Sequence, residues 1–441
     1  MAVFNQYYTG ESDRLGAAEK ALIERREALL GPAYRLFYSE PIHVVRGEGA
    51  WLYDADGVAY LDAYNNVPCV GHCHPRVVEA LARQAGTLNT HTRYLDETVL
   101  AYAERLIGTF PTELANAMFT CTGSEANDLA LRVARVVTGG KGVIVTANAY
   151  HGVTSAVAEC SPSLGEHILG DRVRTIAAPD AYRNPDENTG AAFARAVENA
   201  LADMEAAGIR PAALLVDTIF ASDGIFAEPA GFLAPAVEVV RKAGGLFIAD
   251  EVQPGFGRTG SHMWGFERHG LVPDLVTLGK PMGNGHPVAG MVARPELLAE
   301  FGKRTRYFNT FGGNTVSSAV GLAVLEVIRD ENICENARDT GVHLMAGLRD
   351  LAVAHRLIGD VRGAGLYIGV ELVRNGESKR PASDEAAALV AAMKKRHVLL
   401  SPAGPNANVL KIRPPLVFSK DNADTFLAAM GEALVELESD G

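Results

Sequence analysis

Four short, nearly all-apolar segments recur through the middle of this 441-residue chain, and stretches long enough to form helices separate them. These segments are residues 143–146, 213–217, 246–250 and 274–278. Strands that are apolar on both faces are typical of a parallel sheet with helices on both sides. The sequence therefore predicts an α/β fold around a mostly parallel sheet.

The regions on either side of these segments have a different pattern. Residues 11–30 are charged and helix-prone, and residues 44–62 form short apolar runs broken by turn residues. An alanine-rich helix is expected at 317–328, followed by strands within 361–372 and 398–415. A chain of this length usually divides into two domains. We expect an N-terminal segment that contributes to a small domain, a large domain and a C-terminal small α+β domain, at residues 1–64, 65–316 and 317–441.

The formal net charge of −12 argues against nucleic acid or an anionic membrane as a partner, because both require basic surface. The chain has no apolar run of the roughly 20 residues that a spanning helix needs. Its first residues lack a basic stretch followed by an apolar one, so we expect a cytoplasmic protein without a signal peptide.

Five cysteines, an odd number, do not indicate a disulfide framework. Cys69, His72, Cys73 and His74 are residue types that bind metals, but two of them are adjacent and no second pair follows at zinc spacing. We therefore expect no metal site.

An acid and a lysine follow two of the apolar segments. Asp250 ends the segment at 246–250, and Lys280 follows the one at 274–278, among glycines. This pair suits pyridoxal phosphate, because a lysine amine binds its aldehyde covalently and a carboxylate keeps its pyridine nitrogen protonated. Alone, each residue would more often be a helix-capping carboxylate or a solvated lysine.

Longer motifs around both residues resemble the class III (ω-type) pyridoxal-phosphate-dependent aminotransferases. Residues 250–260, Asp-Glu-Val-Gln-Pro-Gly-Phe-Gly-Arg-Thr-Gly, are similar to the segment with the aspartate that binds the pyridine nitrogen. Residues 279–287, Gly-Lys-Pro-Met-Gly-Asn-Gly-His-Pro, are similar to the segment with the cofactor-binding lysine. The resemblance extends from about Tyr34 to Glu438. It implies a fold-type I enzyme with pyridoxal phosphate as cofactor and with Lys280 and Asp250 as catalytic residues.

Thr122 and Glu125 fit a capping box at the start of a helix expected at 128–137, and a helix start presents free N–H groups to an anion. The resemblance implies that cofactor binding also involves a phosphate-binding pair, a tyrosine that stacks on the ring with the histidine beside it, and a glutamine near the ring hydroxyl. It further implies a threonine that reaches the cofactor phosphate of a neighbouring subunit, and hence a homodimer or tetramer with the site at the interface. The matching residues are Gly123, Ser124, Tyr150, His151, Gln253 and Thr310.

The chain departs from many ω-aminotransferases at two positions. Those enzymes pair a glutamate, in Glu-Pro-x-Gln-x-Glu-Gly, with an arginine three residues before a C-terminal proline. Here Ser222 stands at the second glutamate and Lys411 at the arginine. Lysine cannot form the bidentate contact with which an arginine binds a substrate carboxylate. Arg413 shares a strand face with Lys411 and could take that role after a register slip, which leaves an aminotransferase open.

Other segments resemble the phospho-lyase branch of the family, namely Asn-Asn-Val at 65–67, Asn-Thr-His-Thr-Arg at 89–93 and Asn-Val-Leu-Lys at 408–411. This implies elimination of phosphate from O-phosphoethanolamine, giving acetaldehyde, ammonia and phosphate. Such a substrate has no carboxylate but needs groups that bind its phosphate. The alternatives are a class III aminotransferase of the alanine/glyoxylate or ω-amine type, a phosphohydroxylysine phospho-lyase, and a cofactor-binding regulator without turnover. The candidates for phosphate binding are Lys411, Arg413, Arg93 and Asn66.

Overall fold

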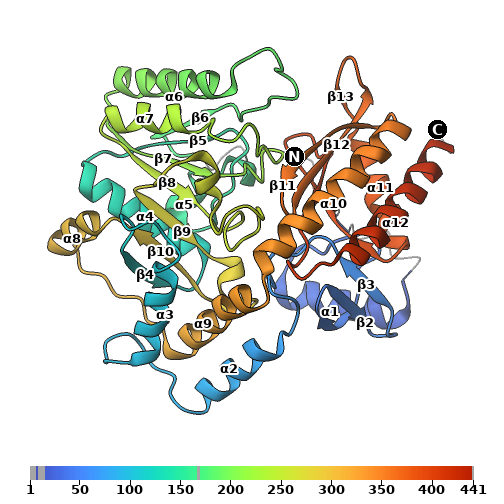
Figure 1. The fold of residues 1–441 in the computed structure, drawn as a ribbon, viewed down its shortest axis with the longest axis horizontal. Helices are drawn as coiled ribbons and strands as arrows, with labels where there is room; N and C mark the ends of the chain where they lie inside the picture. The colour runs from blue at the N-terminus through green and yellow to red at the C-terminus, as the bar shows by residue number, and fades with distance from the viewer. Residues whose placement is uncertain (1–5, 8–14, 166–168, 440–441) are drawn as a thin grey trace.

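The structure is a computed structural model, and it describes residues 6–7, 15–165 and 169–439. Its central sheet has seven strands in the order β4-β10-β9-β8-β7-β5-β6 (Figure 1). Strands β9, β8, β7, β5 and β6 pair in parallel, whereas β10 is antiparallel to both of its neighbours. The predicted mostly parallel sheet is confirmed. Its strands are β4 (Asn116–Thr120), β5 (Gly142–Thr146), β6 (Val173–Ile176), β7 (Pro211–Asp217), β8 (Leu246–Asp250), β9 (Leu275–Leu278) and β10 (Ala289–Ala293).

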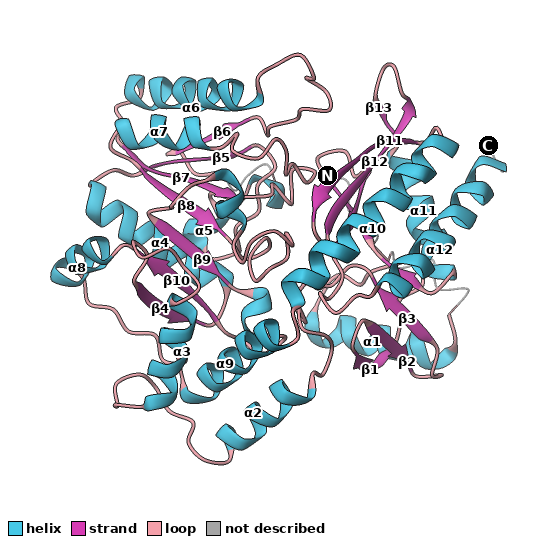
Figure 2. Ribbon diagram, in the orientation of Figure 1, coloured by secondary structure: helices cyan, strands magenta, loops and turns pink. Residues whose placement is uncertain are grey.

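Helices cover both faces of this sheet, as the apolar strands predict (Figure 2). Successive residues along a strand point to opposite faces. On β7, Leu215 belongs to the apolar cluster that contains residues of α4 (Gly123–Thr138). Its neighbour Leu214 belongs to the cluster that contains residues of α6 (Thr189–Ala206) and α7 (Ala234–Lys242).

Of two smaller sheets, the first brings the N-terminal and C-terminal parts of the chain together. The first contains β1 (Val44–Glu48), β2 (Trp51–Asp54), β3 (Ala59–Asp62) and β14 (Val398–Leu399), and β14 pairs in parallel with β3. The second sheet contains β11 (Ile358–Ala364), β12 (Tyr367–Asn375), β16 (Val409–Ile412), β15 (Ser401–Ala403) and, paired with β12, β13 (Arg380–Pro381). The expected domain boundaries at residues 64 and 316 stay a prediction.

Helices α10 (Ile333–Ala354), α11 (Ser383–Lys395) and α12 (Lys420–Ser439) flank this second sheet on the right of Figure 1. Helix α9 (Thr315–Asp330) contacts both α10 and the turn at Lys280–Gly283. Helix α1 begins at Ala17, whereas the sequence suggested a start near residue 11; residues 11–14 lie outside the described part of the chain. The helix expected at 317–328 is longer at both ends. The remaining helices are α1 (Ala17–Leu30), α2 (Pro75–Ala85), α3 (Glu97–Ile107), α5 (Ser155–Ala158) and α8 (Pro295–Arg304), with 3₁₀ turns η2 (Pro162–Leu164), η3 (Gly265–His269) and η4 (Lys280–Gly283).

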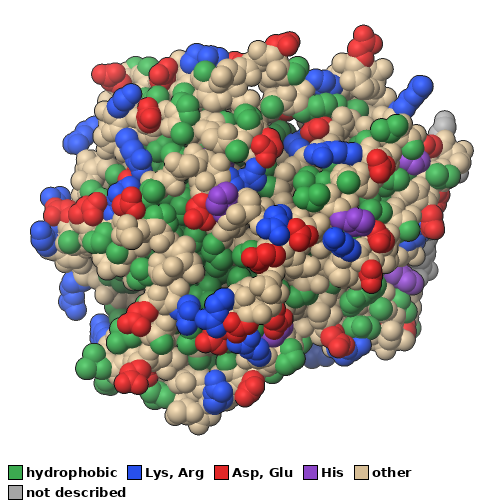
Figure 3. Space-filling view, viewed as in Figure 1, with side chains coloured by type: hydrophobic (Ala, Val, Ile, Leu, Met, Phe, Trp, Pro, Cys, Tyr) green, Lys and Arg blue, Asp and Glu red, His purple; other side chains and the backbone are tan. Residues whose placement is uncertain are grey.

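Acidic and basic side chains are interspersed on the face seen in Figure 3. Across the described ranges, no helix is both long and apolar enough to cross a membrane. Nor do the described residues contain a cluster of three or more His, Cys, Asp or Glu side chains able to hold a metal ion. Two histidines of the Cys69–His74 stretch contact carboxylates instead, since the Nε2 of His72 lies 2.8 Å from Asp62 and that of His74 lies 3.1 Å from Glu331.

Candidate active site

Asp250 and Lys280 lie at the same edge of the central sheet. Strands β8 and β9 pair in parallel with Asp250 opposite Thr277, so their carboxyl ends meet where Lys280 begins η4. Both residues line a cavity of about 160 Å³. Lys280 has a φ of +34°, a conformation that residues other than glycine rarely adopt. The other residues that line this cavity are Gly123, Ser124, Tyr150, His151, Gly152, Asp217, Val252 and Gln253.

The carboxylate of Asp250 is buried and held by three hydrogen-bond partners. Its Oδ2 lies 2.7 Å from His151 Nδ1 and accepts a hydrogen bond of 3.0 Å from Asn127 Nδ2. Its Oδ1 accepts one of 3.1 Å from the Val252 amide. Asn127 also donates to the His151 carbonyl and accepts from Thr277 Oγ1, at 2.8 and 2.7 Å. These contacts fix the orientation of the acid before any ligand arrives.

The first turn of α4 forms the opposite side of the cavity. Thr122 Oγ1 accepts from the Glu125 amide at 3.1 Å, and Glu125 Oε2 accepts from the Thr122 amide at 3.0 Å, which confirms the predicted capping box. Gly123 and Ser124, the next two residues, line the cavity, and Ser124 Oγ accepts from the Val153 amide at 3.1 Å. A helix start with free N–H groups here suits a phosphate.

Glycine is required at residue 152, where the chain passes Ser124. Gly152 has a φ of +139°, and a Cβ atom at this position would lie 2.8 Å from Ser124 Cα. Side chains other than hydrogen are excluded by both the backbone conformation and the lack of space.

Burial lowers the pKa of Lys280 to about 8, and the positive charge of Arg413 acts in the same direction. The carboxylates of Asp250 and Asp217 oppose this shift. Burial, together with the Asp250 carboxylate, raises the pKa of Asp217 to about 6. A lysine whose pKa is lowered to this extent is partly neutral at neutral pH and can accept a proton.

Arg413 and Asn66, both predicted as phosphate ligands, are buried and contact each other. Arg413 Nη1 donates to Asn66 Oδ1 at 2.9 Å and to Gln253 Oε1 at 2.5 Å. Gln253 Oε1 also accepts from Tyr367 at 2.9 Å, and Arg413 lies over the ring of Tyr64. Arg413 thus binds the glutamine that lines the 160 Å³ cavity.

Lys411 lines a second cavity, of about 520 Å³, together with Ser222. Tyr150 lines both cavities, which therefore lie side by side. Burial and then Arg413 lower the pKa of Lys411 well below its usual range, against the opposing effects of Asp217 and Asp223. The structure therefore brings Lys411 close to the predicted catalytic lysine.

Arg93 and Thr310 lie outside the lining of both cavities, as far as the described residues of this single chain define it. The guanidinium carbon of Arg93 is 3.9 Å from the ring centroid of Phe308, and His91 stacks on Tyr94 at 5.1 Å. Thr310 is exposed on the same loop as Phe308. That Arg93 and Thr310 contact a ligand stays a prediction.

Several residues of the site were not predicted. Asn127 lies one helical turn after Gly123, which is a local signal that could have placed it at the cavity. Asp217 ends β7 opposite Asp250, and its oxygens accept from the Ile219 and Ala221 amides at 2.9 and 3.1 Å. Its position directly after an apolar strand is the same signal that identified Asp250.

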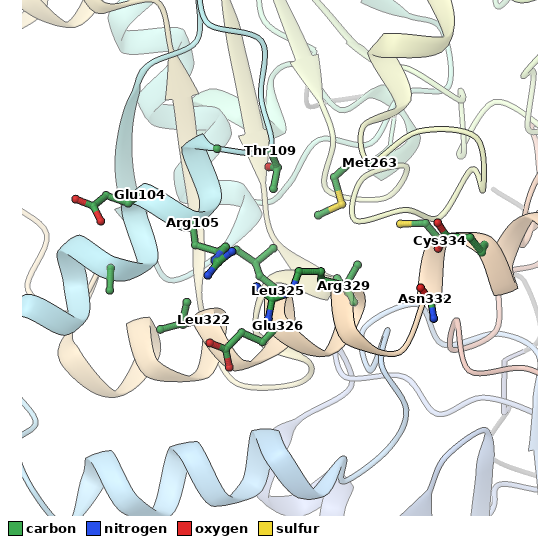
Figure 4. A pocket seen from close by; sticks show the side chains of 14 residues that line it. Glu104, Arg105, Thr109, Met263, Leu322, Leu325, Glu326, Arg329, Asn332 and Cys334 are labelled. Atoms are coloured by element: carbon green, nitrogen blue, oxygen red, sulfur yellow. The ribbon is translucent and has the colours of Figure 1, made fainter.

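A larger cavity, of about 900 Å³, lies away from these residues, between α3, α9 and the segment around Met263 (Figure 4). Its lining mixes charges of both signs, such as Glu104, Arg105 and Arg329. Among the described residues, none of the predicted site residues lines it. The chemistry of the side chains, and not cavity volume, identifies the candidate site.

The donor set of the smaller cavity fits pyridoxal phosphate. It offers a lysine amine for the aldehyde, an oriented carboxylate for a protonated ring nitrogen and a glycine-containing helix start for the phosphate. The Nε2 of His151 is buried and has no hydrogen-bond partner among the described residues.

Comparisons with known proteins agree with this donor set. The sequence profile of the family described as aminotransferase class-III matches residues 37–434. An alanine–glyoxylate aminotransferase 2-like protein of Drosophila melanogaster is 41% identical, over 96% of this chain and 88% of the relative. The ethanolamine-phosphate phospho-lyase homolog 1 of Caenorhabditis elegans is 36% identical, over 95% of this chain and 94% of the relative. The solved structure of a phospholyase from Arthrobacter in complex with phosphoethanolamine superposes with a TM-score of 0.91 at 44% identity, over 94% of this chain and 99% of that one.

Proposed function

We propose that this chain, which belongs to the class III aminotransferase family, is a phospho-lyase acting on a small phosphorylated amine. The members of this family depend on pyridoxal phosphate. The observation that carries this proposal is Lys411, which lines the cavity beside the cofactor site together with Ser222. The proposed substrate is O-phosphoethanolamine. The similarity to a phospholyase in complex with phosphoethanolamine supports this choice.

The proposed reaction needs no oxidant and no second substrate other than water. The carbon that carries nitrogen loses a proton, and the neighbouring C–O bond breaks so that phosphate leaves with its electron pair. The two-carbon enamine that remains takes up a proton and water and gives acetaldehyde and ammonia. One O-phosphoethanolamine and one water thus balance one acetaldehyde, one ammonia and one phosphate.

The residues of the smaller cavity would have separate roles in this reaction. Bound pyridoxal phosphate withdraws electrons from the carbon next to the substrate nitrogen, which makes its C–H bond acidic. Asp250, held by His151 and Asn127, would keep the ring nitrogen protonated. Lys280 would hold the cofactor and then accept the proton, for which its lowered pKa suits it.

The pair Ser222 and Lys411 favours elimination over transamination of an amino acid. Arg413 is oriented by contacts of its Nη1 with Asn66 and Gln253, whereas its Nε is buried without a partner among the described residues. Lys411, at the position of the carboxylate-binding arginine, provides a single point charge and not a bidentate fork. A phosphate group forms a favourable ion pair with a single positive charge of this kind.

The test is to mix purified, cofactor-loaded protein with O-phosphoethanolamine alone and to follow phosphate and acetaldehyde. We expect catalytic release of both in equal amounts without a keto acid. The control is Lys280→Ala, which should release neither phosphate nor acetaldehyde and should lack the visible absorbance of the covalently bound cofactor. Wild-type protein that releases neither product would refute the proposed substrate.

An aminotransferase is the second candidate, because the Drosophila relative carries that name at 41% identity. It predicts conversion of the cofactor to its amine form by L-alanine and recovery with pyruvate or glyoxylate. A phosphohydroxylysine phospho-lyase would instead release phosphate from that longer substrate and little from O-phosphoethanolamine.

We also propose a homodimer or larger assembly in which Thr310 reaches the partner's cofactor phosphate. Large apolar side chains are exposed on the two loops that carry Arg93 and Thr310, which supports this assembly. Light scattering at micromolar concentration should give at least twice the chain mass, and a monomer with full activity would contradict the proposal. These side chains are Leu88, Tyr94, Leu95, Phe308 and Phe311.

A further inference from the structure

The 520 Å³ cavity, here called the outer cavity, contains two cationic side chains from distant parts of the chain. Lys411 comes from β16, and Arg35 comes from the segment between α1 and β1. Tyr150 connects this cavity with the one that contains Lys280. An anionic group carried by an amine bound at Lys280 would therefore extend toward both cations.

The two acids that act on Lys411, Asp217 and Asp223, already accept hydrogen bonds from other groups. Asp223 Oδ2 accepts from Thr146 Oγ1 at 2.7 Å, and its Oδ1 accepts from the Asn148 amide at 3.1 Å. Asp217 accepts hydrogen bonds from two backbone amides. None of the described residues forms an ion pair or a side-chain hydrogen bond with Lys411. Its ammonium group is thus available to a ligand in the outer cavity.

Arg35 is held in place by the N-terminal residues. Its Nη1 donates to Gln6 Oε1 at 2.8 Å, and Gln6 pairs with Phe37 as an isolated antiparallel bridge. The Tyr7 amide donates to the Leu36 carbonyl at 3.0 Å. Within the described ranges no carboxylate pairs with Arg35. A guanidinium has five N–H donors, so several remain after the contact with Gln6.

Neutral side chains accompany the two cations in the lining of the outer cavity. Ser222 lines the outer cavity, and its carbonyl accepts from Asn148 Nδ2 at 2.6 Å. Asn148 itself lines the cavity. Among the described residues, the lining of the outer cavity contains no carboxylate. The negative charges that act on Lys411 are those of Asp217 and Asp223, which already accept other hydrogen bonds.

We propose that Arg35 and Lys411 together bind the phosphate of the substrate in the outer cavity, with Arg35 as a specificity-determining residue. The inference rests on the proposed function and assigns its phosphate site. Arginine and lysine in combination suit a phosphate, because the guanidinium offers paired donors and the ammonium a point charge. A plain solvated arginine is the competing interpretation, and it predicts no effect of Arg35 on substrate binding.

The experiment compares Arg35→Gln with wild type and with Arg25→Gln, an exposed arginine of α1 that lies outside the lining described for both cavities. In Arg35→Gln we expect the KM for O-phosphoethanolamine to rise about tenfold, the typical loss of a charged hydrogen bond, with kcat largely unchanged. The affinity of the holoenzyme for inorganic phosphate, measured by calorimetry, should fall by a similar factor. Binding of ethanolamine, followed by the visible absorbance of the cofactor, should not change.

Two outcomes for Arg35→Gln would overturn the inference. Unchanged KM and unchanged phosphate affinity in Arg35→Gln would make Arg35 a solvated surface residue. An equal loss of ethanolamine and O-phosphoethanolamine binding would make its role structural, and rescue by Arg35→Lys is expected only if its charge matters. Wild-type protein that releases no phosphate from O-phosphoethanolamine would refute the proposed function itself. In that case the calorimetric comparison still decides whether Arg35 binds a phosphate.

Discussion

The Nδ1 atom of His151 lies 2.7 Å from the Oδ2 atom of Asp250, and both side chains are buried. Because Asn127 donates to the same oxygen, the orientation of the acid depends on two residues that are more than 90 positions away in the chain. The acid would face a cofactor ring nitrogen with its geometry already fixed, which is a form of preorganisation.

Replacing Asn127 tests this arrangement. Asn127→Ala would remove hydrogen bonds to Asp250, the His151 carbonyl and Thr277. Since buried polar groups would lose their partners, we expect the free energy of unfolding to fall by about 1–3 kcal/mol and cofactor affinity to decrease. Urea unfolding and cofactor titration measure the two effects. Thr277→Val, which removes only one of these bonds, should cost less, and an equal cost would contradict the argument.

The pKa of Lys280 predicts how apoenzyme regains its cofactor. Only the neutral amine attacks the aldehyde, so a pKa lowered to about 8 makes the rate of reconstitution rise with pH and level off above about 8. A lysine with its usual pKa near 10.4 would continue to gain reactivity well beyond that pH. The rate is measured from the visible absorbance of the bound cofactor.

Arg413 provides the control for this pH dependence, because its positive charge contributes to the lowered pKa of Lys280. Arg413→Met should move the inflection to higher pH. The titration of free pyridoxal phosphate is common to both proteins and cancels in the comparison. An unchanged inflection would mean that burial alone sets the pKa.

Gly152 and Gly208 form a matched pair of substitutions. A Cβ at Gly152 would meet Ser124, whereas one at Gly208, with φ of +69°, would meet no described atom within 4 Å. We expect Gly152→Ala to weaken cofactor binding about tenfold or more, since an overlap of this kind costs about 1–3 kcal/mol. Gly208→Ala should cost about 1–2 kcal/mol of stability through its backbone conformation alone and leave cofactor affinity unchanged. Equal effects on cofactor affinity would argue against the close approach at Ser124.

Ser222 allows a test in which only charge differs. Ser222→Glu would place a carboxylate in the outer cavity that contains Lys411, and Ser222→Gln would place a neutral side chain of similar size there. We expect kcat/KM for O-phosphoethanolamine to be about tenfold lower in the glutamate variant than in the glutamine variant, because the carboxylate repels phosphate and attracts the lysine. Equal values would indicate that steric bulk, and not charge, controls the site.

Short-range features of the sequence predicted the fold and the centre of the candidate site. The apolar runs at β8 and β9 indicated adjacent parallel strands, and parallel pairing then necessarily places Asp250 and Lys280 at one edge. The capping box of Thr122 and Glu125 was predictable because both partners lie within one helical turn.

The sequence by itself thus determined which elements form and which chemical groups end them, since these depend on hydrophobic periodicity and on contacts between near neighbours. Only the tertiary structure decided that Arg413 binds Asn66 and Gln253, and that Arg35 faces the same cavity as Lys411. Arg413 and Asn66 are 347 positions apart. The segments that carry them are joined by the parallel pairing of β3 with β14 and by a hydrogen bond of 2.9 Å from the Arg413 amide to the Ala63 carbonyl. Such contacts follow from the packing of whole sheets, which no local pattern of residues encodes.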